Sequence, residues 1–118
     1  MSRSINRKRV ISRSRLRGLS DRFYNIINKR DLSAFKSELS RINDPEILNS
    51  ISKGGKSIVV MVIDSGDVDL LRELLKYKID RKLLEEGLSY CNKNIDNVNE
   101  IEELLKAALY ADSIGIRD

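Results

Sequence analysis

The chain has 118 residues, with 22 basic and 18 acidic side chains, 41% hydrophobic residues, one cysteine and no histidine. This length allows one domain, or a domain with a tail, and no apolar run approaches the roughly 18 residues of a transmembrane helix. A single cysteine cannot form an internal disulfide, and without histidine the usual zinc ligand and the usual general base at neutral pH are missing. We therefore expect an intracellular protein, cytoplasmic or nuclear, that is not an enzyme and has no metal, no cofactor and no membrane partner.

Basic residues are concentrated at the N-terminus. The first 20 residues carry seven basic side chains and no acid, whereas the rest of the chain carries 15 basic and 18 acidic groups. Such a segment has too little apolar surface to fold alone, so we expect a basic arm over residues 1–19. Three roles fit it: a solvated tail, an import signal, or a clamp that grips the phosphates of RNA or DNA. The basic residues of the arm are Arg3, Arg7, Lys8, Arg9, Arg13, Arg15 and Arg17.

Two helices are predicted between residues 20 and 42. Ser20 can cap a helix that begins at Asp21, and Asp31 can cap the next one, because their oxygens accept from the free N–H groups of a first turn. Pro45 cannot continue the second helix, so it ends in the sequence Asn43-Asp44-Pro45. The residues expected to face the core are Phe23, Ile26, Ile27, Leu32, Phe35, Leu39 and Ile42. Residues 45–53 then form either a helical turn or an exposed finger between two helix pairs.

The stretch from 54 to 80 predicts two short helices. Ser57 can cap the first, Gly66 suits the left-handed position that ends it, and Asp67 can cap the second. The apolar block Ile58–Ile63 favours a strand by propensity, but no other stretch alternates with period two, so a strand would lack a partner. We therefore predict helix for this block. The second helix has one apolar stripe, formed by Leu70, Leu71, Leu74 and Leu75.

Two further helices are expected before a C-terminal tail over 111–118. Asp80 can cap a helix over 81–92, in which Gly87 costs helix stability and so predicts close packing against a neighbouring helix. A polar turn over 92–97 follows, and Ser113–Asp118 is expected to fray. The apolar residues of these helices are Leu83, Leu84, Leu88 and Cys91, then Val98, Ile101, Leu104, Leu105, Ala108 and Leu109.

None of the remaining polar motifs predicts catalysis. Glu85-Glu86 and Glu102-Glu103 are adjacent in sequence, so they diverge on a helix and are expected to be solvated. Cys91 lies on an apolar stripe and is expected to be a buried core thiol. The sequence Gly54-Gly55-Lys56-Ser57 matches only the end of a phosphate-binding loop, because Ser50 stands where the first glycine belongs.

The stretch Gly55–Asp80 resembles an ankyrin repeat. Ser57-Ile58-Val59-Val60 stands at the Thr-Pro-Leu-His corner of that family, and Lys78-Ile79-Asp80 stands at its closing Gly-Ala-Asp, although the Pro and His are missing. Two other segments match this one. Phe23–Leu39 aligns on Val59–Leu75, and Asn97–Leu105 aligns on the second helix. The cap positions Asp31, Asp67 and Asn97 are 36 and 30 residues apart, close to the repeat length of about 33 in this family.

We therefore predict an all-α fold: a short stack of about three divergent ankyrin-like helix-turn-helix repeats over residues 20–110, behind the basic arm. The resemblance implies non-enzymatic binding of another protein, as an adaptor or scaffold, on a face made by the first helices and the fingers. Two alternatives remain open: a structural subunit of a nucleoprotein assembly, anchored by its arm on RNA or DNA, and a small helical inhibitor or regulator of an enzyme. The residues expected on the binding face are Ser50, Ser52, Lys53 and Lys56.

Overall fold

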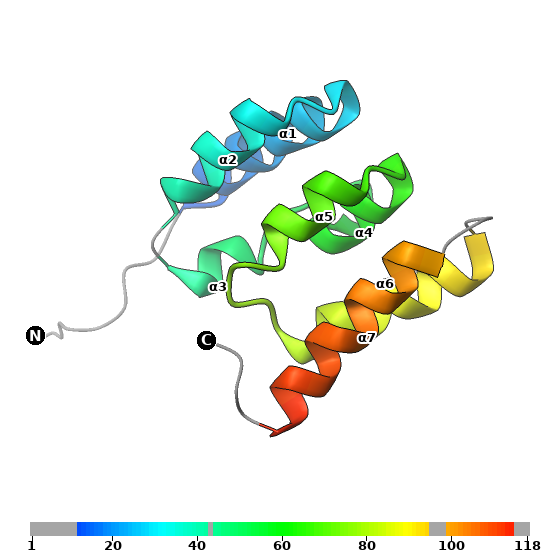
Figure 1. The fold of residues 1–118 in the computed structure, drawn as a ribbon. Helices are drawn as coiled ribbons and strands as arrows, with labels where there is room; N and C mark the ends of the chain where they lie inside the picture. Colours follow the sequence, from blue (N-terminus) through cyan, green and yellow to red (C-terminus); the bar gives the residue numbers. More distant parts are fainter. Residues whose placement is uncertain (1–11, 43, 95–98, 115–118) are drawn as a thin grey trace, which may run out of the picture.

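The computed structural model describes residues 12–42, 44–94 and 99–114 and is mostly helical (Figure 1). This confirms the prediction of an all-α fold. The described residues form seven helices and one small antiparallel sheet, in the order α1 (Arg13–Lys29), α2 (Leu32–Ser40), α3 (Pro45–Leu48), β1 (Ser52–Lys53), β2 (Lys56–Ser57), α4 (Ile58–Ser65), α5 (Val68–Leu74), α6 (Arg81–Asn94) and α7 (Asn99–Ile114).

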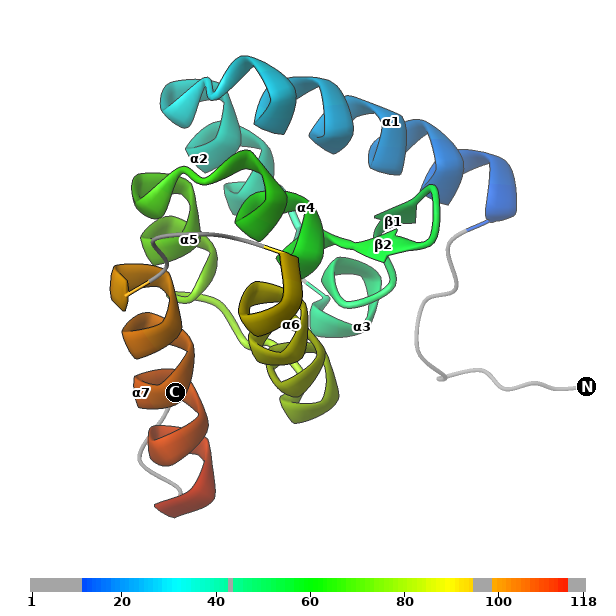
Figure 2. The same cartoon turned by 90° about the vertical axis from the view of Figure 1, so that its right-hand side faces the viewer.

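Six of these helices form three pairs that lie side by side: α1 with α2, α4 with α5, and α6 with α7 (Figure 1). The first helices of the pairs, α1, α4 and α6, pack in one row that we call the inner layer. The second helices, α2, α5 and α7, pack in another row that we call the outer layer. The β1–β2 hairpin contacts α1 and α4, so it lies at the inner layer (Figure 2).

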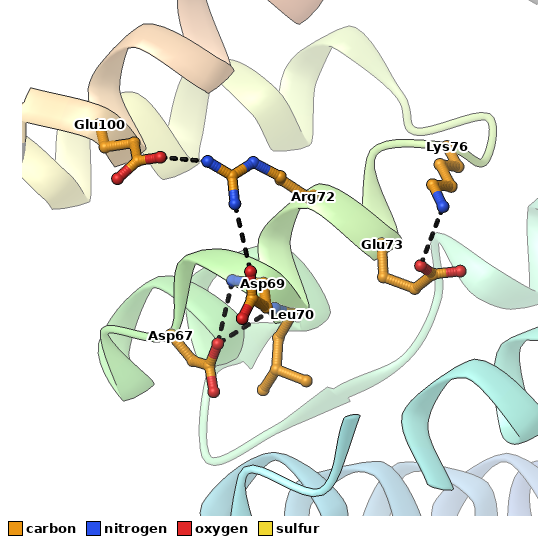
Figure 3. Close-up of polar contacts among 7 residues, drawn as sticks. All are labelled: Asp67, Asp69, Leu70, Arg72, Glu73, Lys76 and Glu100. Atoms are coloured by element: carbon orange, nitrogen blue, oxygen red, sulfur yellow. Dashed lines mark hydrogen bonds and ion pairs between the residues drawn. The ribbon is translucent and has the colours of Figure 1, made fainter. Parts of the chain in front are cut away.

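The apolar block after Ser57 is helical, as predicted. The Ser57 hydroxyl accepts from the Val60 N–H, and Gly66 ends α4 with a φ of 74°. Asp67 caps α5, because its carboxylate accepts from the backbone N–H groups of Asp69 and Leu70 (Figure 3). All six residues of the block are buried, and Ser57 and Gly66 cap it as a helix despite its strand propensity.

The junction between the two helices of the first pair resembles the junction in the second pair. Asp31 caps α2 by accepting from the Ala34 N–H at 3.1 Å, as Asp67 caps α5 at the position 36 residues later. Arg30 ends α1 in the left-handed conformation, with a φ of 53°, at the position equivalent to Gly66. A left-handed residue therefore joins the two helices in both pairs, but only the second pair uses glycine for it.

The predicted start of the first helix is wrong. The helix begins at Arg13 rather than Asp21, and its cap is Ser12, whose hydroxyl accepts from the Arg15 N–H. Ser20 lies inside α1 and is buried, because the hairpin packs there and the Ser52 N–H donates to the Ser20 hydroxyl at 3.3 Å. The boundary expected at residue 19 therefore falls inside α1.

Residues 45–57 contain both elements that the sequence left open. Pro45 begins the single turn α3, which Asp44 caps, and the hairpin follows with Ser52 opposite Ser57 and Lys53 opposite Lys56. Gly54 and Gly55 form its turn, with φ of 61° and 78°. Positive φ at both turn residues is what a tight type I′ hairpin requires, so two glycines suit this position.

A single asparagine ties α3 to the segment before α6. The Asn49 amide donates to the carbonyl of Lys78 at 2.9 Å and accepts from the N–H of Asp80 at 2.8 Å. The same amide nitrogen donates to the carbonyl of Pro45. These bonds fix the path of the chain between the second and third helix pairs.

The third pair packs on the second as closely as Gly87 suggested. A Cβ atom at Gly87 would lie 2.7 Å from Val59 Cγ1 and 2.9 Å from Ile63 Cδ1, so only glycine lets α6 approach α4 this closely. In the outer layer, Arg72 of α5 pairs with Asp69 and with Glu100 of α7 (Figure 3).

The ends of the third pair differ from the prediction. α6 continues to Asn94, two residues further than expected, and α7 continues to Ile114, so Ser113 and the first part of the expected tail are helical. Leu84, Cys91, Ile101 and Leu105 are buried, and the other predicted apolar positions among the described residues of the pair are partly buried. The predicted cap Asn97 and the stripe residue Val98 lie outside the described residues.

Candidate functional site

The two lysines of the hairpin are held on neighbouring helices in the same way. Lys53 Nζ lies 2.9 Å from Asp21 Oδ1 of α1 and 5.5 Å from the ring centre of Tyr24, one helical turn further along. An ammonium over an aromatic face is attracted by the partial negative charge on the face of the ring. Lys53 therefore joins β1 to α1 through a carboxylate and a tyrosine.

Lys56 makes the matching cluster on the other side of the hairpin. Its Nζ lies 3.0 Å from Asp64 Oδ2 of α4 and 5.8 Å from the ring centre of Tyr90 of α6. The Tyr90 hydroxyl donates to Asp64 Oδ1 at 2.6 Å. We call the two clusters, Lys53–Asp21–Tyr24 and Lys56–Asp64–Tyr90, the lysine clamps.

The second clamp shifts the acidity of all three of its members. The Tyr90 hydroxyl, followed by the Lys56 ammonium, holds the pKa of Asp64 below its ordinary value. The hydrogen bond to Asp64 in turn raises the pKa of Lys56 and that of Tyr90. The cluster therefore keeps one negative and one positive charge through the neutral range, with the tyrosine protonated.

The clamps also reduce the charge repulsion between the two lysines of the hairpin. Lys53 and Lys56 are direct cross-strand partners, and like charges in such a pair destabilise a hairpin. Each ammonium is neutralised by its own aspartate on a different helix, Asp21 or Asp64. The hairpin is therefore fixed across α1, α4 and α6, and it spans the inner layer.

A cleft of about 230 Å³ opens beside the clamps, between α1 and α4. Ile27 and Met61 line it with apolar atoms and are almost fully buried. Its polar and aromatic lining consists of Tyr24, Asn28, Arg30, Lys56, Asp64 and Ser65. An apolar floor with a polar rim suits the side chain of a bound partner, which can bury its carbon atoms and still form hydrogen bonds.

The face predicted from the sequence is only partly assembled. Lys53 and Lys56 come together through the hairpin and both belong to the clamps. Ser50 and Ser52 are exposed, but the Ser50 hydroxyl donates to the carbonyl of Glu46. Ser52 holds the hairpin on α1 through its backbone N–H. Both serines thus support the hairpin locally, and neither lines the cleft.

The basic residues predicted for the arm fall into two groups. Arg13, Arg15 and Arg17 lie on the exposed first turns of α1, and within the described residues none of them pairs with a carboxylate. The other four, Arg3, Arg7, Lys8 and Arg9, lie outside the described residues.

The residues on the helices that complete the site were not predicted from the sequence. Asp21, Tyr24 and Asp64 reach the lysines only through tertiary packing, so no local pattern indicates them. Arg30 did carry a signal. In the alignment of the first two helix pairs it falls on Gly66, and an arginine at a left-handed position is unusual.

Other polar groups keep to structural positions. Cys91 is fully buried, as predicted, and burial, followed by the nearby Glu102 charge, raises the pKa of its thiol. Glu85 and Glu86 are exposed, and Glu85 pairs with Arg81. Among the described residues, acidic and thiol side chains do not gather in threes around a point where a metal could bind. The helices in the described ranges all lack the combination of length and apolar character needed to cross a membrane.

Compared with known protein families, curated proteins and solved structures, the chain shows no significant match in any of the three comparisons.

Proposed function

We propose that this chain is a non-enzymatic protein-binding module, built as a divergent ankyrin-like stack, whose binding face is the inner layer with its hairpin. The observation that carries the proposal is the cleft beside the lysine clamps. It combines an apolar floor, an exposed tyrosine and several charged groups, on a surface that three helices hold in place. A face that is rigid before binding loses little conformational entropy when a partner docks.

The exposed aromatic residue supports this choice of face. Tyr24 is 39% exposed, and the ammonium of Lys53 lies over its ring, 5.5 Å from the ring centre. Tyrosine is enriched at protein interfaces because it offers a large contact area with few rotatable bonds. A partner chain that covers Tyr24 would also reach the cleft that this ring lines.

A second candidate function is anchoring to a nucleic acid through the basic arm, as a subunit of a nucleoprotein assembly. Its support is the exposed arginines at the start of α1, which pair with no carboxylate of the described residues. Arg15 and Arg17 are two residues apart on a helix and therefore point in nearly opposite directions. Such a spread suits contact with phosphates on more than one side, and it predicts binding that falls steeply with salt.

Capture of partners from a lysate of the source cells separates the two functions. We expect the full chain to retain a protein after nuclease treatment, and Asn28→Trp, which fills the mouth of the cleft, to lose it. Inverting both clamp lysines, Lys53→Glu with Lys56→Glu, should have the same effect. The matched control is Lys36→Glu, because Lys36 is exposed on α2 of the outer layer.

The arm is tested in the full chain by changing its first four basic residues to glutamine. Removing residues 1–19 is not suitable, because α1 begins at Arg13 and would lose its first turns. Capture that survives the glutamine changes supports binding by the inner layer. The nucleic-acid function is supported, and the first proposal is overturned, if the glutamine changes or nuclease abolish capture while Asn28→Trp leaves it intact.

A further inference from the structure

Arg30 combines an unusual backbone conformation with a positive charge at the inner layer. It is the only residue other than glycine with a positive φ among those described, and its equivalent in the next helix pair is Gly66. A side chain at such a position strains the backbone, and strain of this kind is often found at binding sites. Arg30 is one of the residues that line the cleft, and its guanidinium pairs with no carboxylate of the described residues.

Two more arginines, Arg13 and Arg17, lie on the side of α1 that faces the hairpin. Arg17, Asp21, Tyr24 and Asn28 are spaced by four, three and four residues, so they lie on one side of the helix. Asp21 and Tyr24 contact Lys53 of the hairpin, and Asn28 lines the cleft. Arg17 must therefore also lie on the hairpin side of α1, and Arg13, one turn earlier, lies near it.

The first helix pair as a whole carries a net positive charge. Residues 12–42 carry eight basic and three acidic side chains, whereas the other described ranges carry nine basic and thirteen acidic ones. The carboxylates beside the hairpin, Asp21 and Asp64, are each neutralised by a lysine. The inner face of this pair therefore presents net positive charge through Arg13, Arg17 and Arg30.

We propose that this arginine track, Arg13, Arg17 and Arg30 with the cleft between α1 and α4, binds an acidic extended segment of another protein. The inference rests on the proposed function and assigns the chemistry of the partner. Arg17 and Arg30 are 13 residues apart, which is about 20 Å along a helix. An extended peptide covers that distance in about six residues. The segment places carboxylates at both ends of this span and an apolar side chain beside the second, over Ile27 and Met61.

Charge spacing favours a protein segment over a nucleic acid on this track. A nucleic acid carries a phosphate at every nucleotide, so its middle phosphates would lie beside Lys53 and Lys56, whose charges Asp21 and Asp64 already neutralise. A peptide can carry carboxylates only at the positions that face the arginines and have neutral residues between them. The guanidinium groups can then form paired hydrogen bonds with each carboxylate.

Fluorescence anisotropy with defined probes tests the inference. The probe is a labelled peptide of about twelve residues with two glutamate pairs about six residues apart, Ser and Gly between them, and one Leu beside the second pair. The comparison probes are the same peptide with glutamine for glutamate, and a labelled oligouridine of equal charge. We expect the glutamate peptide to bind at least about tenfold more tightly than either comparison probe.

Three variants of the full chain assign the contacts. Arg17→Glu and Arg30→Gly should each weaken binding of the glutamate peptide by about tenfold, because each removes one end of the track. Arg15→Glu makes the same charge change on the far side of α1 and should leave affinity within about twofold of the parent. Arg30→Gly also relieves backbone strain, so we expect a loss of affinity in this variant to come from the lost guanidinium and not from unfolding.

Several outcomes would overturn the inference: no measurable binding of the glutamate peptide, tighter binding of oligouridine, or an equal loss of affinity in Arg15→Glu. These outcomes leave the proposed function standing if Asn28→Trp still abolishes partner capture while Lys36→Glu does not. Loss of that distinction would remove the proposed function together with the inference.

Discussion

Gly87 of α6 lies against Val59 of α4 so closely that a Cβ atom on the glycine would be 2.7 Å from Val59 Cγ1. This contact sets the distance between the second and third helix pairs. Val59 is itself fully buried within the hydrophobic core. The fit between these two helices is therefore sensitive to a single methyl group.

Gly87→Ala should destabilise the protein despite the higher helix propensity of alanine. Overpacking costs about 1–3 kcal/mol, while the gain in propensity is about 1 kcal/mol, so the net loss should be on the order of 1 kcal/mol. Urea unfolding followed by circular dichroism measures it. Gly18→Ala on α1 is the matched control, because nothing lies within 4 Å of a Cβ there, and it should stabilise the protein. Stabilisation by both changes would contradict this account of the packing.

Introducing a glycine at one left-handed position and removing the glycine at the other should change the free energy of unfolding in opposite directions. Arg30→Gly should raise the free energy of unfolding by about 0.5–1 kcal/mol, because it removes the steric cost of a side chain at positive φ. Gly66→Ala should lower it by about 1 kcal/mol for the same reason. Thermal unfolding of both variants beside the parent checks the pair. A destabilised Arg30→Gly would mean that the Arg30 side chain contributes more to the fold than its backbone costs.

Removing the Asn49 amide should weaken the connection between α3 and the third helix pair. Asn49→Ala loses the bonds to the Lys78 carbonyl and the Asp80 N–H, and we expect a loss of about 2 kcal/mol. Hydrogen exchange should show faster exchange of the Asp80 N–H. Asn25→Ala, an exposed position on α1, is the control and should change stability by less than about 0.5 kcal/mol. A neutral Asn49→Ala would show that water replaces these bonds without cost.

The Lys56–Asp64–Tyr90 clamp should give stability a dependence on acid pH. The folded-state pKa of Asp64 is lowered. Its contribution to the free energy of unfolding is therefore complete above the ordinary carboxyl pKa, and it is lost as pH falls through the lowered value. Asp64→Asn should therefore cost stability at neutral pH, by less than about 1 kcal/mol because the clamp is partly exposed. The difference from the parent should vanish in acid, where both side chains are neutral. A difference that is the same at both pH values would contradict the electrostatic role.

The helix pairs were predictable because their signals are local. Ser57, Gly66 and Asp67 mark the ends of α4 and α5, and Asp31 marks the start of α2 by the same capping geometry. Leucine stripes then indicate which side of each helix is buried. The chain therefore carries enough local information to place most helices of the stack.

The start of α1 and the hairpin were not predictable in this way. Ser20 is as good a cap as Ser12 by residue type, and only the hairpin packed beside it explains why Ser20 is buried inside α1. Strands of two residues are too short to show any alternation, so only the Gly54-Gly55 pair between β1 and β2 indicates a hairpin. The fold decides both features through contacts between distant segments.

The candidate site was predictable only where the hairpin carries it. Lys53 and Lys56 were identified from their position between helix pairs, whereas their partners Asp21 and Asp64 come from separate helices. A charged residue on an exposed helix face looks the same whether or not a distant lysine reaches it. The cleft likewise exists only after α1 and α4 have packed.

Site-directed photocrosslinking tests most directly whether another protein docks on the inner layer. A photoreactive amino acid is placed at Asn28 on the rim of the cleft or, as the control, at Lys36 on the outer layer, in the full chain. The account predicts a discrete protein adduct from Asn28 that resists nuclease, and none from Lys36. Adducts of equal yield from both positions, or no adduct from Asn28, would contradict it.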